Sequence, residues 1–161
     1  MRSFGARAHQ DARVYFTGGT TAVLMGWRDT TIDIDMRFNP ELDELFRALP
    51  ALKEELQINI ELVSPSDFIP PLPGWEERCA YIAREGKVSF YHFDPYSQAL
   101  AKIERGHTQD MKDVEMMLKK GLLEREKLLS LYQAIEPQLY RYPAIDPGSF
   151  SKAVHRFVGQ K

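Results

Sequence analysis

The clearest pattern in this chain is an alternation of apolar and polar residues from Thr31 to Phe38. Its apolar face carries Ile32, Ile34, Met36 and Phe38. Its polar face carries Asp33, Asp35 and Arg37. Strict alternation of this kind predicts a β-strand with one buried face.

Other stretches predict further strands. The run VYF at 14–16 favours a short strand, and Gln57 to Val63 alternates with Asn59 and Glu61 on its polar face. Two more apolar stretches, Arg78 to Arg84 and Lys87 to Phe93, flank a tight turn at 85–86, which is typical of a β-hairpin.

Helical periodicity appears between and after these strands. We expect a short apolar helix after Gly19, a helix that starts at Asn39-Pro40, and an interruption of that helix at Pro50. The C-terminal part predicts helices over 94–106, 108–121, 124–135 and from about 147, with a weak helix within 3–12 at the other end. Strands followed by a block of helices indicate an α+β fold. We therefore predict one domain over 1–161, with a sheet core in 1–93 and a helical layer in 94–161 packed on it.

The segment SPSDFIPPLPGWEER at 64–78 combines many prolines with apolar residues. Proline excludes a helix interior and a central strand, so we expect a rigid loop packed on the body of the protein. A proline-rich ligand for a partner domain is the alternative interpretation.

Composition narrows the class of protein. The 161 residues, 43% of them hydrophobic, suit one globular domain, and a net charge of -2 argues against a protein that coats nucleic acid. The single cysteine, Cys79, excludes an internal disulfide and is expected to be a small core residue. No apolar run reaches the ~18 residues of a membrane span, and the N-terminus lacks a secretory h-region. We therefore expect a cytoplasmic protein.

Two features lie close together and carry chemistry. Asp33 and Asp35 point the same way from one strand, a costly arrangement unless a cation sits there. Gly18, Gly19 and Thr20 form a turn into a helix, whose free N–H groups and dipole suit phosphate. Together they predict a metal-dependent nucleotide site. A solvated acidic strand face and a simple helix cap are the structural alternatives.

The spacing of these motifs resembles a known superfamily. Gly18-Gly19-Thr20, twelve intervening residues and then Asp33-x-Asp35 are similar to the signature of DNA polymerase β-like nucleotidyltransferases. The wider pattern GGTxAxxxGxRxTxDID resembles single-domain bacterial nucleotidyltransferase-like proteins, some of which are related to abortive-infection and toxin–antitoxin systems. The resemblance implies a mixed β-sheet flanked by helices, Mg²⁺ (or Mn²⁺) on the Asp-x-Asp strand, and an NTP substrate.

A third carboxylate is usual in that superfamily. Glu61 is our candidate because it lies on the polar face of its predicted strand, although many members carry Asp there. Asp67 in the following loop is the second candidate, and an ordinary surface role for Glu61 is the alternative.

Further candidates flank this core. Arg28 precedes the acidic strand and would contact phosphate or stabilise the aspartates; the sequence leaves both open. In KIERGHTQDMKDVEMML, the resemblance to toxin-like relatives implies that Lys102 contacts phosphate and that Asp110 or Asp113 orients it, whereas ordinary helix surface and capping explain the same residues. His107 is a weaker candidate in the same block.

Two hypotheses follow. The first is a Mg²⁺-dependent nucleotidyltransferase that moves an NMP from an NTP to an acceptor hydroxyl, with Asp33, Asp35 and Glu61 as metal ligands and catalytic residues. The acceptor is open among protein, RNA end and small molecule, and no membrane partner is expected. The second is a non-catalytic member that binds nucleotide or a partner protein, in a toxin–antitoxin setting by analogy. Both are compatible with an oligomer.

Overall fold

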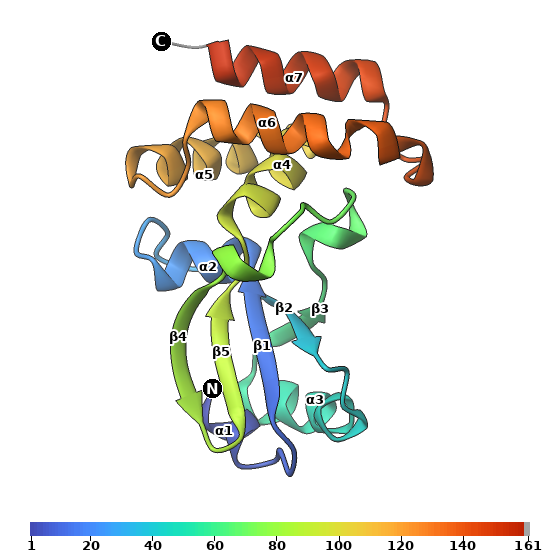
Figure 1. The fold of residues 1–161 in the computed structure, drawn as a ribbon. Coiled ribbons are helices and arrows are strands. Elements are labelled where there is room, and N and C mark those ends of the chain that lie inside the picture. Colours follow the sequence, from blue (N-terminus) through green and yellow to red (C-terminus); the bar gives the residue numbers. More distant parts are fainter. Residues whose placement is uncertain (160–161) are drawn as a thin grey trace. The chain divides into compact units, whose positions relative to one another are not determined.

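The computed structural model describes residues 1–159 and divides into two compact units (Figure 1). Unit 1 comprises 1–64 and 79–93, and unit 2 comprises 65–78 and the chain from Asp94 onward. The predicted boundary after residue 93 therefore coincides with one point where the chain passes between units. The proline-rich segment 65–78 groups with the C-terminal helices rather than with the sheet.

Unit 1 is built on a mixed five-stranded sheet. Its strands are β1 (Ala12–Thr17), β2 (Asp33–Asn39), β3 (Asn59–Leu62), β4 (Ala80–Glu85) and β5 (Val88–His92). Their order in the sheet is β3-β2-β1-β5-β4. β1 runs antiparallel to β2 and parallel to β5, β2 is parallel to β3, and the predicted β4–β5 hairpin is antiparallel. The predicted α+β class with a mixed sheet is confirmed.

The hydrophobic core of unit 1 covers one face of this sheet. Helix α3 (Asp43–Leu56) supplies Leu45, Ala48 and Leu52 to it, and α1 (Arg2–Gly5) supplies Phe4. The strands contribute Val14, Phe16, Met36, Phe38, Ile60, Val88 and Phe90. Because neighbouring residues on a strand face opposite ways, Asp33, Asp35 and Glu61 lie on the other face of the sheet.

The acidic strand is shorter than its alternation predicts. β2 begins at Asp33, and the Ile32 side chain is 87% exposed rather than part of the core. The predicted apolar face of the next strand is also only partly buried: Ile60 is in the core, but Ile58 and Leu62 are exposed. β3 lies at the edge of the sheet and has four residues, so it offers little area for burial.

Helix α3 departs from prediction at both its start and its middle. It begins at Asp43 rather than at Asn39-Pro40, and it continues through Pro50 without interruption. Asp43 and Glu44 in the first turn favour this start, because acidic side chains stabilise a helix N-terminus. The buried stripe extends on both sides of Pro50, so packing outweighs the hydrogen bond that proline removes.

Unit 2 contains four longer helices. They are α4 (Pro95–Arg105), α5 (Thr108–Lys119), α6 (Arg125–Ile135) and α7 (Pro147–Gly159). Helix α4 contacts α5, α6 and α7, and α6 lies beside α7 (Figure 1). Gly106 ends α4 as predicted, with a left-handed φ of 67°, whereas the N-cap of α5 is His107 and not Thr108. Within residues 1–159, no helix has the length and apolar character needed to cross a membrane.

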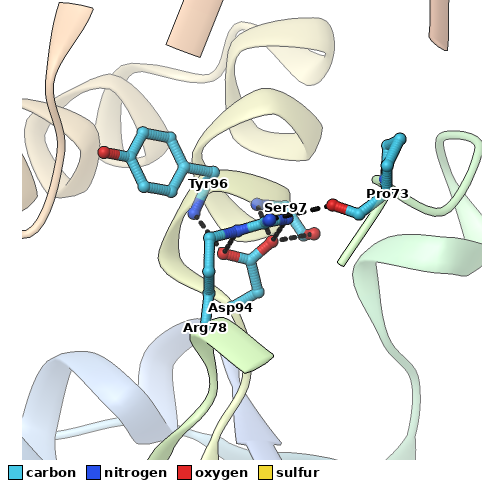
Figure 2. A network of polar contacts seen from close by, with 5 residues as sticks. All are labelled: Pro73, Arg78, Asp94, Tyr96 and Ser97. Carbon is cyan, nitrogen blue, oxygen red and sulfur yellow. Dashed lines mark hydrogen bonds and ion pairs between the residues drawn. The ribbon is translucent and has the colours of Figure 1, made fainter. Parts of the chain in front are cut away.

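The start of α4 is fixed by a buried network (Figure 2). The Asp94 carboxylate accepts hydrogen bonds from the Tyr96 and Ser97 backbone N–H groups and from the Ser97 hydroxyl, which caps the helix. Arg78 donates two hydrogen bonds to the same carboxylate, from Nε at 3.0 Å and from Nη2 at 2.8 Å. Its Nη1 also donates to the Pro73 carbonyl. The predicted helix start at Asp94-Pro95 is confirmed, and charge-assisted bidentate bonding explains its rigidity.

The proline-rich segment is ordered by packing. It forms two short 3₁₀ turns, Pro65–Asp67 and Glu76–Arg78, and buries the side chains of Ile69 and Leu72. The Arg105 guanidinium lies 5.3 Å from the centre of the Phe68 ring. The expectation of a packed loop is confirmed, and the Arg105–Phe68 contact lies within unit 2.

Candidate functional site

Strand register brings the predicted carboxylates together on one face of unit 1. Asp33 and Asp35 are two residues apart on β2, so they share that face. In the parallel pairing with β3, Asp35 lies opposite Glu61 and Asp33 lies opposite Asn59. The result is an acidic cluster of Asp33, Asp35 and Glu61 at the end of the sheet where β1 leads into α2 (Gly18–Leu24).

Asn59 is the member of this cluster that the sequence did not single out. Its Nδ2 donates to Asp33 Oδ1 at 2.7 Å and to Glu61 Oε1 at 2.9 Å. One amide thus bridges two carboxylates and offsets part of their repulsion. Its position on the polar face of the same strand as Glu61 was the available signal, but only the β2–β3 register places it opposite Asp33.

The cluster fits a hard divalent cation by the chemistry of its donors. Mg²⁺ and Mn²⁺ prefer carboxylate oxygens, and Asp33, Asp35 and Glu61 supply only such oxygens. Among residues 1–159, no three His, Cys, Asp or Glu side chains are already gathered closely enough to enclose an ion. Metal ligation by these residues therefore stays a prediction, with small side-chain shifts required.

Gly18 meets Asp35 at the first residue of α2. The backbone of Gly18 has a φ of +58°, and an ideal Cβ there would lie 2.4 Å from Asp35 Oδ2. Only glycine allows this conformation together with the close approach of the carboxylate. The positive end of the helix favours negative charge at this point, so the Asp35 carboxylate stabilises the start of α2. In turn, the absence of a side chain at Gly18 leaves room for that carboxylate.

This geometry predicts that Gly18→Ala destabilises the protein more than Gly26→Ala does. Both glycines have positive φ, but a Cβ at Gly26 would meet nothing within 4 Å. Gly26→Ala should lower the free energy of unfolding by about 1–2 kcal/mol from backbone strain, and Gly18→Ala by more because it also displaces Asp35. Urea denaturation measures both. Equal losses would contradict the close approach of Asp35 to Gly18.

Thr20 joins the turn to the acidic strand. Its hydroxyl donates to the Asp33 carbonyl at 3.5 Å, and the Asp35 N–H donates to the Thr20 oxygen at 3.2 Å. The Thr31 hydroxyl also donates to the Asp33 carbonyl, at 3.0 Å. These bonds hold the α2 start beside the strand segment between the two aspartates. The Thr20 hydroxyl therefore has a structural role, and phosphate binding by the backbone of 18–20 stays a prediction.

Arg28 lies beside the same turn. Its Nη1 is 3.4 Å from the position that a Cβ of Gly19 would occupy, and Thr31 Oγ1 is 2.2 Å from that position. The guanidinium is half-buried and thus adjacent to the N-terminal turn of α2. Both roles left open by the sequence, contact with phosphate and stabilisation of the aspartates, stay predictions.

His92 contacts α2 through the Thr21 side chain. It is buried at the end of β5, and its Nδ1 lies 3.3 Å from the Thr21 hydroxyl, which itself donates to the Phe16 carbonyl. Burial lowers the pKa of His92 below its usual value, because a low-polarity environment disfavours the charged ring. His92 is therefore a neutral packing residue at neutral pH.

The second predicted group of site residues, which contains Lys102, Asp110 and Asp113, forms a buried ion cluster within unit 2. Lys102 is 4% exposed, and its Nζ lies 2.8 Å from Asp110 Oδ1 and 2.7 Å from Asp113 Oδ2. Arg105 also contacts Asp110, at 3.0 Å. The expectation of an exposed lysine is wrong, because α4 packs against α5 and both aspartates face it. A role of Lys102 or Asp113 toward nucleotide stays a prediction. His107 is an exposed N-cap, and Asp67 belongs to unit 2, so its role as a third metal ligand stays a prediction.

Comparison with known families agrees with the motif spacing. The family model described as "Nucleotidyltransferase of unknown function (DUF6036)" matches residues 6–145, which include the GGT turn and the acidic cluster. The chain therefore belongs to this nucleotidyltransferase family. Searches of curated proteins and of solved structures found no match to the chain.

Proposed function

We propose that this protein transfers a nucleoside monophosphate from an NTP to an acceptor hydroxyl, with cleavage of the α–β phosphoanhydride bond, release of pyrophosphate, and Mg²⁺ or Mn²⁺ as the metal. One observation carries the proposal: Asp33, Asp35 and Glu61 share one face of the sheet beside the GGT turn. Membership of a nucleotidyltransferase family supports it. The fold alone would not, because one fold hosts many functions.

In this proposal Asp33, Asp35 and Glu61 hold the metal. A divalent ion held there would supply neutralisation of phosphate charge and activation of the attacking oxygen. Asp35 is pre-positioned by the Gly18 turn, and Asp33 by its hydrogen bond from Asn59. The metal-bound arrangement requires the Asn59 amide to release Asp33 or Glu61, since an amide donor and a cation compete for the same carboxylate oxygens.

The remaining residues bind the triphosphate and the acceptor. The backbone N–H groups of Gly18, Gly19 and Thr20 face phosphate at the start of α2, and Arg28 adds a fixed positive charge. Glu61 is exposed, so an acceptor can reach it, and its carboxylate takes the proton of the acceptor hydroxyl. Protein, RNA end and small molecule are all compatible acceptors, and a toxin–antitoxin role rests on the sequence resemblance.

One observation favours a second function, a non-catalytic member that binds nucleotide or a partner protein. The Asn59 amide already donates hydrogen bonds to carboxylate oxygens of Asp33 and Glu61. In a member without metal, such an amide takes the place of the cation. If that bridge is permanent, the cluster binds no metal. Incubation with α-labelled NTPs and Mg²⁺ separates the two functions, because only the first yields labelled acceptor.

A thermal-shift prediction tests the metal site without knowledge of the acceptor. Mg²⁺ with a non-hydrolysable NTP should raise the Tm, because a ligand of the folded state stabilises it by mass action. At about 100 times Kd the gain is about 2.7 kcal/mol. In Asp33→Asn/Asp35→Asn the shift should largely disappear, while Asp29→Asn, a control at an exposed acidic residue outside the strand, should respond like wild type. A shift of equal size in the double variant would place the nucleotide elsewhere.

A further inference from the structure

A cavity lies in unit 1, away from the acidic cluster. It has a volume of about 290 Å³ and is located where β1 and β5 begin and β2 ends. Its lining comes from all three strands and from the β4–β5 turn. The polar and charged lining residues include Asp11, Arg13, Arg84, Lys87, Ser89 and Tyr91.

The lining is strongly basic for this protein. Three cationic side chains, those of Arg13, Arg84 and Lys87, face one carboxylate, Asp11, which gives the cavity a net charge of +2 in a chain of net charge -2. Arg84 pairs with Asp11 at 2.7 Å, and Lys87 Nζ donates to the His9 carbonyl at 2.8 Å. The hydrogen bond of Lys87 therefore goes to a neutral backbone acceptor and not to a carboxylate. Such a cavity attracts anions.

The cavity shares a sheet face with the acidic cluster but is separate from it. Arg13 lies opposite Asn39 in the β1–β2 pairing, and Thr17 lies opposite Asp35 on the same face. The two positions are four steps apart along each strand, which corresponds to about 14 Å at the rise of an antiparallel strand. An NTP whose reacting phosphate sits at Asp35 therefore does not bring that phosphate into this cavity.

One aromatic residue lines the cavity and contacts two further aromatic rings. Tyr91 is a lining residue, and its ring stacks on Tyr15 with centroids 5.4 Å apart and an angle of 29°. On its other side, Tyr81 packs edge-on to Tyr91 at 5.6 Å and is 61% exposed. An exposed aromatic ring beside a basic cavity is the combination that binds a base and its phosphate together.

We propose that this cavity binds one nucleotide unit through its phosphate, with the base against Tyr81. Arg13 and Lys87 contact the phosphate as charged donors, and Ser89 adds a hydroxyl. The volume suits a single phosphorylated unit. That unit is either a free nucleotide or the end of a nucleic-acid strand, and the experiment below distinguishes them. Its identity as the acceptor for transfer rests on the proposed function; the binding itself does not.

Isothermal titration with AMP in EDTA tests the site without the proposed metal. Wild type should bind AMP more tightly than adenosine by at least about tenfold, because adenosine lacks the phosphate. Arg13→Gln and Lys87→Gln should each weaken AMP binding about fivefold to tenfold, and Lys119→Gln, which removes an exposed charge in unit 2, should not. Tyr81→Ala should weaken binding, and Tyr81→Phe should restore it.

Two measurements make the outcome decisive. Amide NMR shifts with AMP should concentrate at 87–91 and spare 18–20, and a short single-stranded RNA should be compared with AMP. Tighter binding of RNA assigns the site to a strand end, and equal binding assigns it to a free nucleotide. Equal affinity for AMP and adenosine, or wild-type affinity in both Arg13→Gln and Lys87→Gln, would overturn the proposal.

The same experiment tests the cavity proposal separately from the proposed transferase function. Asp33→Asn/Asp35→Asn should bind AMP in EDTA like wild type, because those residues lie about four positions along the strands from the cavity. Loss of AMP binding in that variant would overturn the assignment of the ligand to this cavity. Retained binding without any nucleotidyl transfer by wild type would leave the cavity assignment intact and refute the transferase proposal.

Discussion

Asp33→Asn/Asp35→Asn is expected to lose nucleotidyl transfer by at least about 100-fold, which corresponds to about 2.7 kcal/mol of transition-state stabilisation. An amide is neutral and binds divalent ions poorly, so the charge that would hold the metal is removed. The substitutions are nearly isosteric. The amide oxygen introduced at position 33 can still accept from Asn59, and an amide fits beside Gly18 where the Asp35 carboxylate lies.

Transfer of label from α-labelled NTP to any acceptor in a cell extract, or to the protein itself, measures this effect. Urea denaturation of the variant should show wild-type stability, which separates loss of chemistry from loss of fold. Asp29→Asn is the matched control, because Asp29 is an exposed acidic residue close in sequence but outside the strand. Transfer at the wild-type rate in the double variant would refute the assignment of these aspartates.

Local sequence patterns predicted the elements that depend on local chemistry. The glycine-rich start of α2, the β4–β5 hairpin, and the helix from Asp94-Pro95 to Gly106 all follow from residues adjacent in the chain. The aspartates of the acidic cluster were found in the same way, because their alternation fixes which face of a strand they share.

What local patterns did not predict depends on register and position in the sheet. Asp35 lies opposite Glu61 only because β2 and β3 pair in parallel, and this same pairing brings Asn59 to Asp33. No spacing within either strand encodes that offset. Ile32 continues the apolar alternation perfectly but lies outside the strand, since pairing with β1 and β3 starts beyond it.

Tertiary packing overrode sequence signals at two other places. Proline usually interrupts a helix, yet α3 passes through Pro50 because Leu45, Ala48 and Leu52 bury one continuous stripe against the sheet. Lysine is usually exposed, yet Lys102 is enclosed between α4 and α5 with its charge matched by aspartates. The basic cavity arose from the same cause, since Arg13, Arg84 and Lys87 meet only in the folded sheet.

The buried position of Lys102 leads to a large stability prediction. Lys102→Met should lower the free energy of unfolding by about 3–5 kcal/mol, because it removes the ammonium that faces two buried carboxylates. Asp110 keeps Arg105 as a partner, and Asp113 loses a buried cation at 2.7 Å, so both carboxylates contribute to the cost. A loss of this size is a large fraction of the stability of a small protein. Urea denaturation measures it, with exposed Lys119→Met as the control.

A double-mutant cycle with Asp113→Asn identifies the cause of that loss. If charge pairing is responsible, Lys102→Met/Asp113→Asn should be less destabilised than the sum of the single variants by about 1–3 kcal/mol, because the second substitution removes the negative charge that faced the Lys102 ammonium. Replacement of a whole buried ion cluster costs less than removal of one member, for the same reason. Unchanged stability in Lys102→Met, together with weaker NTP binding, would contradict the structural role and support the phosphate contact predicted from the sequence.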